Sequence, residues 1–271
     1  MSQILSENPR KIAIITGAGT GIGAAIALRL ARLRWRVVLG GRRRDKLEEV
    51  AAAIRTGGGE AVVVPCDATL PADVSRLVAA AGPTLDALIH SAGKGHCLTI
   101  DELTLEEWNE TIGTATTGAF LTAKLALPKL RATAGGPGHI IEICSLASGG
   151  TWNKEIGYGT AKGAQLKFAL HLASQMRVEA EAGGRRIHVH AICPGTVDTP
   201  FWTNIPQRTI EPGKCLGADE VAWVVEQVIA NPAATAEALA TVKPRREIVI
   251  KRHAPFERWD NVIALAHESH P

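Results

Sequence analysis

The feature that most constrains the fold of this chain is a regular alternation of short apolar runs with longer helical patterns. Several of the runs lack polar and apolar alternation, as expected of strands buried on both faces. Two of the helical patterns are long, at about 105–129 and 158–182. Seven runs rich in β-branched residues recur along the sequence, at 11–16, 35–40, 60–65, 85–90, 139–144, 186–193 and 246–251. This order predicts an α/β fold in which helices cover both faces of a doubly wound parallel sheet of about seven strands.

The chain has no visible division into domains. With 46% apolar and 21% charged residues it has an ordinary globular composition, and no internal repeat or Pro/Ser-rich linker separates one half from the other. We expect one domain spanning 1–271, with its core at about 11–252. From His253 to Pro271 the pattern dissolves, and this tail could be a lid, an oligomer contact or loose chain.

Charge and hydropathy exclude several classes of partner. The net charge of +3 comes without a long basic tract, which argues against nucleic acid. No apolar run approaches the ~18 residues of a membrane span, and the first residues, MSQILSENPRK, lack the apolar centre of a signal peptide. We therefore expect a cytoplasmic protein without a membrane partner.

Cysteine and histidine spacing gives no sign of a metal centre. The five cysteines are spread out and form no C-x-x-C pair, so neither a disulfide framework nor a zinc ribbon is indicated. His188, His190 and Cys193 have a metal-like spacing, but no other His/Cys cluster completes a site. We expect no bound metal.

A glycine-rich loop follows the first apolar run. Residues 16–23 read TGAGTGIG and open a helical pattern. A strict G-x-G-x-x-G is absent, although Gly19, Gly21 and Ala24 fit the looser form that ends in alanine. Glycines there let the backbone approach a pyrophosphate, and a helix N-terminus offers it unpaired N–H groups. The loop predicts a Rossmann-like dinucleotide site.

The end of the second apolar run bears on which dinucleotide binds. An acid there would bind the ribose 2′-hydroxyl of NAD, whereas an arginine suits the extra phosphate of NADP. The sequence reads VVLGGRRR, with no acid at Gly40 or Gly41 and Arg42 next. A guanidinium can hold a phosphate through paired charge-assisted bonds, which favours NADP(H). The alternative is that the arginines are a solvated basic start of a helix.

The pentapeptide YGTAK, residues 158–162, holds the only tyrosine of the chain. Tyr158 and Lys162 share a helical face, which by itself is common in helices that do no chemistry. Hydride transfer to a carbonyl leaves a growing alkoxide, which needs one donor to polarise it and one acid to protonate it. Ser145 and Tyr158 can supply these groups, and a neighbouring ammonium favours the phenolate.

Taken in order along the chain, these motifs resemble those of the short-chain dehydrogenase/reductase family, across about residues 11–252. TGAGTGIG is similar to its glycine loop, Asp67 in PCDAT to its adenine contact, and YGTAK to its Tyr-x-x-x-Lys. Ser145 lies thirteen residues before Tyr158, the family's spacing, and CPGTVDT resembles the loop whose threonine, here Thr199, contacts the nicotinamide amide.

The resemblance implies roles for individual residues. Ser145, Tyr158 and Lys162 would be catalytic, with Lys162 also binding the nicotinamide ribose. It further implies a homo-oligomer, a homotetramer or a dimer, often formed through the two long helices. The predicted cofactor-binding residues are Thr16, Gly17, Gly19, Thr20, Gly21, Ile22, Gly23, Arg42, Asp67, Ala92, Gly93, Tyr158, Lys162, Pro194, Gly195 and Thr199.

Two departures from the family pattern stand out. Its usual N-N-A-G after the fourth strand is replaced by His90, Ser91, Ala92 and Gly93, and Ala115 stands where its fourth catalytic residue, an asparagine, is expected. In the family the relay water is held largely by the main-chain carbonyl at this position, which alanine retains. We expect the segment to stay helical with a changed or absent kink.

The sequence thus predicts an NADP(H)-dependent oxidoreductase that interconverts a carbonyl and a secondary alcohol. The alternative, motivated by Ala115, is a redox-silent NADP(H)-binding sensor with the same fold. Residues 198–215 correspond to the substrate loop, and Trp152, Phe201 and Trp202 are candidates for an apolar pocket wall or for ordinary packing. Lys94 and His96 are candidates for contact with an acidic or polar group. Substrate identity and physiological direction stay open.

Overall fold

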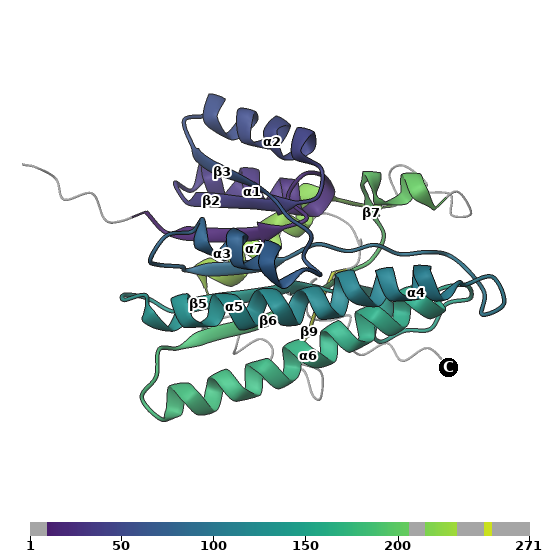
Figure 1. Ribbon diagram of the computed structural model, residues 1–271. Coiled ribbons are helices and arrows are strands. Elements are labelled where there is room, and N and C mark those ends of the chain that lie inside the picture. Colours follow the sequence, from purple (N-terminus) through teal and green to yellow (C-terminus); the bar gives the residue numbers. More distant parts are fainter. Residues whose placement is uncertain (1–9, 206–214, 232–246, 251–271) are drawn as a thin grey trace, which may run out of the picture.

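The computed structural model describes residues 10–205, 215–231 and 247–250, the last of these as backbone only. The predicted tail at 253–271 lies outside the described residues. So do residues 206–214 of the predicted substrate loop, 198–215. Figure 1 shows a layered molecule in which a twisted sheet lies between two sets of helices.

The sheet has seven parallel strands in the order β3-β2-β1-β4-β5-β6-β9. The strands are β1 (Ile12–Thr16), β2 (Arg36–Gly41), β3 (Glu60–Pro65), β4 (Ala87–His90), β5 (Gly138–Ile143), β6 (Ile187–Pro194) and β9 (Glu247–Ile250). The apolar runs become strands without alternation because the sheet is covered on both faces, and Ala13, Ile14 and Ile15 of β1 are fully buried.

The helices form one layer on each face of the sheet. They are α1 (Gly21–Arg32), α2 (Arg44–Thr56), α3 (Pro71–Ala79), α4 (Leu105–Ile112), α5 (Gly118–Ala132), α6 (Ile156–Glu181) and α7 (Ala218–Ala230). One core cluster joins α1, α2 and α7 to the sheet, and a second joins α3, α5 and α6 to the opposite face. The predicted doubly wound α/β fold is confirmed.

The strand order places the switch point of the sheet between β1 and β4. From β1 the chain runs outward through β2 to β3, then returns to β4 and continues in the other direction. The helical connections that follow β1 and β4 therefore run over opposite faces of the sheet. A crevice opens between the carboxyl ends of these two strands. The glycine loop follows β1 at this crevice, because Thr16 is the last residue of β1.

The long helical pattern predicted at 105–129 is one continuous helical segment with a wider turn in its middle. A π-helical stretch, η1 (Gly113–Thr117), joins α4 to α5, and the N–H of Gly118 bonds the carbonyl of Gly113. Ala115 is fully buried within it. The segment stays helical as expected, and the local change takes the form of a π turn, a feature often found near functional sites.

Short elements that the sequence pattern does not predict lie near the crevice. They are the 3₁₀ turns η2 (Leu146–Ser148) and η3 (Pro200–Asn204) and the two-residue strands β7 (Val197–Asp198) and β8 (Leu216–Gly217). Within the described ranges, no helix combines the length and hydropathy needed to cross a membrane.

Candidate active site

A pocket of about 750 Å³ lies at the carboxyl ends of the strands. Its lining includes every residue predicted to bind the cofactor, together with Ser145, Phe201 and Trp202. Trp152 does not line it: the indole packs on Gly150 and is 46% exposed. The structure therefore gathers all the predicted site residues except Trp152 around one cavity.

The glycine loop is shaped by close contacts that admit no side chain. Gly17 has a φ of +65°, and a Cβ there would lie 2.9 Å from the backbone of Ala92. A Cβ on Gly23 would lie 2.4 Å from the Gly17 carbonyl oxygen. Helix α1 begins directly after Thr20, whose side chain makes no capping bond to it. Its first N–H groups therefore remain available to an anion beside the loop.

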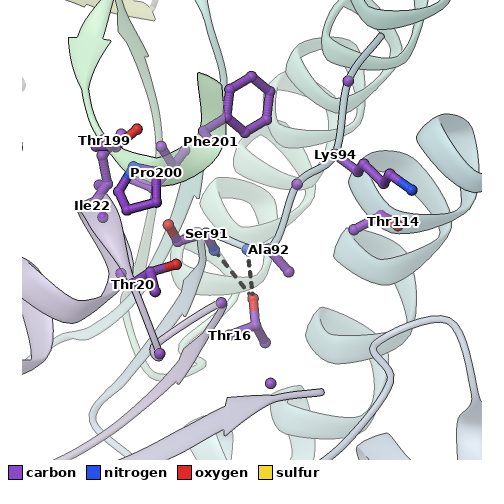
Figure 2. Close-up of a pocket in the computed structure, with 18 of the residues that line it drawn as sticks. Thr16, Thr20, Ile22, Ser91, Ala92, Lys94, Thr114, Thr199, Pro200 and Phe201 are labelled. Atoms are coloured by element: carbon purple, nitrogen blue, oxygen red, sulfur yellow. Dashed lines mark hydrogen bonds between the residues drawn. The ribbon is translucent and has the colours of Figure 1, made fainter. Parts of the chain in front are cut away.

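Thr16 joins β1 to the turn after β4, as Figure 2 shows. Its Oγ1 accepts hydrogen bonds from the backbone N–H groups of Ser91 and Ala92, each at 3.1 Å. The same hydroxyl lies 3.1 Å from Nδ1 of His90. These contacts hold the glycine loop and the turn at 91–92 in fixed positions on the pocket floor.

His90 links that floor to the π turn. Its Nε2 lies 3.1 Å from the carbonyl oxygen of Thr114. A carbonyl only accepts, so Nε2 carries the proton and Nδ1 accepts from Thr16. Burial, reinforced by the nearby charge of Lys162, lowers the pKa of His90 to about 3, so the ring is neutral. The departure at His90 therefore supplies a neutral brace between β1, β4 and η1.

Tyr158 and Ser145 meet at one end of the pocket. Ser145 lies just after β5 and its Oγ accepts from the N–H of Ala147 at 3.1 Å, which fixes the side chain at the start of η2. Removal from water raises the pKa of Tyr158 to about 12, although its hydrogen bond with Ser145 lowers it. Tyr158 therefore holds its proton at neutral pH.

Lys162 lies one helical turn beyond Tyr158 on α6. Its Nζ lies 6.0 Å from the centroid of the Tyr158 ring and donates to the Ile143 carbonyl at 2.8 Å. It also donates to Oε1 of Gln165 at 2.9 Å. Burial lowers the pKa of Lys162, while nearby acidic groups oppose that shift. The ammonium is thus held by fixed acceptors beside the pocket.

The far end of the pocket is basic. Arg42 follows β2, and Arg43 is the N-cap residue of α2. Arg43 Nη2 donates to Thr20 Oγ1 at 3.1 Å. Arg42 is largely exposed and forms a 3.4 Å ion pair with Glu110 of α4. Asp67, which also lines this end, accepts from the N–H and hydroxyl of Thr69 at 2.9 and 2.7 Å.

Aromatic and charged side chains also line the pocket. The Tyr158 and Phe201 rings lie 5.7 Å apart, and the indole of Trp202 donates to the Val197 carbonyl at 2.7 Å. Lys94 forms an ion pair with Glu110, and His96 lies 3.9 Å from the same carboxylate. In Figure 2, Lys94 lies across the site from Thr199 and Pro200.

Sequence reasoning missed several residues that complete the site. Glu110 pairs with both Arg42 and Lys94, and Gln165 holds Lys162. Gln165 could have been found from the sequence, because it lies three residues after Lys162 on the same helix. Nothing in the sequence points to Glu110, because its partners are distant along the chain.

The histidines considered for a metal do share one face. His188 and His190 stack at 6.0 Å, and His139 of β5 stacks on His188 at 5.7 Å. Within the part of the chain that the structure describes, no group of three or more His, Cys, Asp or Glu residues is arranged to hold a metal ion.

Comparison with known proteins places this fold and site in a family. Residues 11–209 match the family model described as short chain dehydrogenase. An uncharacterized oxidoreductase of Staphylococcus aureus (strain MRSA252) is 36% identical over 192 residues, which are 70% of this chain and 79% of that protein. The 2,5-dichloro-2,5-cyclohexadiene-1,4-diol dehydrogenase LinX of Sphingobium indicum is 34% identical over 208 residues, 74% of this chain and 78% of LinX.

Solved structures show the same fold. An alcohol dehydrogenase of the archaeon Thermococcus sibiricus, in complex with 5-hydroxy-NADP, superposes with a TM-score of 0.72 at 26% identity, covering 92% of this chain and all of that one. A short chain dehydrogenase/reductase of Burkholderia phymatum in complex with NAD has the same fold, with a TM-score of 0.73 at 23% identity, covering 86% of this chain and 93% of that chain. The chain therefore belongs to the short chain dehydrogenase family of oxidoreductases.

Proposed function

We propose that this protein is an NADP(H)-dependent oxidoreductase that interconverts a carbonyl compound and a secondary alcohol, with Tyr158 as general acid and base. The proposal rests on the residues that line one pocket. A half-buried tyrosine and serine and a buried lysine lie at one end of it, and a glycine loop with two arginines lies at the other. Such a pocket suits a reaction between a nucleotide cofactor and a small molecule.

The pocket residues fit a dinucleotide. The contacts at Gly17 and Gly23 leave a bare backbone surface, and the first turn of α1 offers N–H groups to a pyrophosphate. When bound, a nicotinamide cofactor supplies or accepts the hydride. The chain's own residues bind it, orient it and handle the proton.

Arg42 and Arg43 support the preference for NADP(H). Both line the pocket where β2 ends, and β2 carries two glycines and no acid there. Arg42 is exposed enough to turn from Glu110 toward a 2′-phosphate. The related archaeal alcohol dehydrogenase was solved with an NADP derivative, whereas the Burkholderia structure contains NAD.

Ser145 and Tyr158 would both act on the substrate oxygen. The Ser145 hydroxyl donates a hydrogen bond to the oxygen, and Tyr158 protonates it during reduction. Because burial raises the pKa of Tyr158 to about 12, the acid form is ready at neutral pH. Oxidation of an alcohol needs the phenolate, so we expect its rate to rise with pH, with Lys162 favouring that form.

Phe201 and Trp202 would form the apolar wall of the substrate site, and Trp152 would contribute only from outside the pocket lining. Phe201 contacts the Tyr158 ring, so a substrate oxygen held by Tyr158 lies beside an aromatic surface. This arrangement suits a ketone or secondary alcohol with an apolar body.

We further propose that the protein acts as a homo-oligomer, a tetramer or a dimer, formed through α5 and α6. Phe120 of α5 is 44% exposed and Val178 of α6 is 56% exposed, so each helix presents an apolar side chain to solvent. Light scattering on the purified protein tests this, and a monomer at micromolar concentration would contradict it.

The test of function measures NADPH absorbance with a panel of aldehydes and ketones, beside a fluorescence titration of NADPH binding. The proposal expects both binding and turnover. Binding without turnover of any substrate, in either direction, would favour the redox-silent sensor. No binding of NADPH or NADH would contradict both readings.

A further inference from the structure

A chain of buried polar side chains leads from Lys162 into the core beneath the pocket. Lys162 Nζ donates to Gln165 Oε1 at 2.9 Å, and Gln165 Nε2 donates to Glu142 Oε2 at 2.8 Å. Gln165 and Glu142 are fully buried, and Lys162 is 4% exposed. Burying a carboxyl group costs free energy, yet the roles proposed above use neither Gln165 nor Glu142.

The direction of these hydrogen bonds follows from their donors. An ammonium only donates, so Gln165 must turn its carbonyl oxygen to Lys162 and its amide N–H toward Glu142. Glu142 then accepts through Oε2. The other oxygen, Oε1, has no hydrogen-bond partner among the described residues. The arrangement suits an ammonium at one end of the chain and a carboxylate at the other.

Glu142 is faced by titratable groups from every element around it. His90 of β4 is its register partner, Cys144 directly follows β5, Cys193 comes from β6, and Lys162 comes from α6. Burial lowers the pKa of His90 to about 3. The hydrogen bond with Cys193, together with burial, raises the pKa of the Cys144 thiol well above its ordinary value.

His90 and Cys144 are therefore neutral near pH 7, and Glu142 is the group that can carry the opposite charge to Lys162. Burial raises the pKa of Glu142 to about 7, although Gln165 and Lys162 oppose the shift. The carboxylate is therefore mostly absent at acidic pH and present at alkaline pH. Its charge opposes the effect of burial, which lowers the pKa of Lys162.

We propose that Glu142 and Gln165 are positioning residues that fix Lys162 Nζ beside Tyr158 and keep it an ammonium at alkaline pH. This inference rests on the function proposed above. Glu142 and Gln165 touch neither substrate nor cofactor and act through Lys162.

The test compares wild type with Glu142→Gln, in which the carboxyl can no longer ionise. NADPH dissociation constants and kcat/KM are measured at several pH values between about 6 and 9. Near pH 6 the two proteins should agree within about twofold, because Glu142 is protonated in wild type. At pH 9 the variant should bind NADPH about 5- to 10-fold more weakly, and its alkaline limb of kcat/KM should move down by about one pH unit.

Two further variants separate charge from packing. Glu181→Gln removes an exposed carboxylate at the end of the same helix and should leave both profiles unchanged. Gln165→Leu breaks the hydrogen-bond chain while leaving Glu142 ionisable, and it should shift the alkaline limb by less than Glu142→Gln. Melting temperatures exclude misfolding as the cause.

An equal loss at every pH in Glu142→Gln would show a merely structural role and overturn the inference, as would unchanged profiles. If wild type binds NADPH but turns over no substrate, the proposed function fails. The pH dependence of NADPH binding then still decides the inference. Absence of NADPH binding by wild type would overturn both.

Discussion

At the scale of single residues, Arg42 is the residue whose proposed role is tested most simply. Arg42→Ala should weaken NADPH binding by about 1.5 to 3 kcal/mol, roughly 10- to 150-fold in Kd, because a charge-assisted contact with the 2′-phosphate is lost. NADH binding should change little, since it lacks that phosphate. Fluorescence titration with both cofactors measures the difference.

The matched control for this experiment is Arg44→Ala. Arg44 lies two residues away, is exposed, and pairs with Glu48 instead of lining the pocket. It should leave both affinities unchanged. Equal losses for NADPH and NADH in Arg42→Ala would mean that Arg42 does not read the phosphate, and a wild-type preference for NADH would remove the assignment.

Most of the residues around the pocket could be named from the sequence because they belong to continuous motifs. TGAGTGIG, YGTAK and CPGTVDT each place several side chains through local geometry, and the structure brings these motifs to one cavity. Trp152 was less predictable, because the loop after η2 turns its indole onto Gly150. Glu142 could not be assigned to the site from sequence, since its link to Lys162 depends on how β5 packs against α6.

At the scale of elements, the strands and helices were predictable because each carries a strong apolar pattern. The π turn η1 was not, since its sequence, GTATT, gives no sign of a wider turn. A tertiary contact holds it: the Thr114 carbonyl accepts from the ring of His90. His90, one of the two departures noted in the sequence, thus contacts η1 at Thr114, the residue that precedes the other departure, Ala115.

We predict that Ala115→Asn changes kcat by no more than ~10-fold, about 1.4 kcal/mol of barrier. The main chain of η1 is already held by His90, so an added amide side chain has little left to brace. Wild type and variant are compared on the same substrates, with Ala119→Asn, another fully buried alanine one turn further on, as the control for packing damage.

Melting temperatures accompany that comparison, because both variants add volume to a packed core. A gain above ~100-fold in Ala115→Asn, or activity that appears only in the variant, would show that the natural protein is an impaired catalyst. The redox-silent sensor would then replace the oxidoreductase as the proposed function.

At the scale of the whole molecule, buried histidines make folding stability depend on pH. Burial, reinforced by His188, lowers the pKa of His190 to about 3, below the ordinary value of 6.5. The unfolded chain therefore binds a proton that the folded protein excludes. The resulting stability is fully present above pH 6.5 and is lost as pH falls toward 3.

His190→Leu removes the contribution of His190 to this dependence. Between pH 7.5 and 5.5 wild type should lose about 1.4 kcal/mol more unfolding free energy than the variant, as measured by urea denaturation. His171→Gln, an exposed histidine on α6, should behave like wild type. Parallel losses in wild type and His190→Leu would mean that His190 titrates normally in the folded protein.

We propose that the fold as a whole places one phenol, that of Tyr158, beside a bound nicotinamide. The most direct measurement is the turnover of Tyr158→Phe, made with steady-state kinetics beside a fluorescence titration of NADPH. Loss of the hydroxyl should lower kcat by ~10² to 10⁴-fold, while the ring, packed against Phe201, keeps its place and NADPH still binds. Retention of more than roughly a tenth of wild-type kcat would contradict the claim, because Tyr158 would then not be the acid.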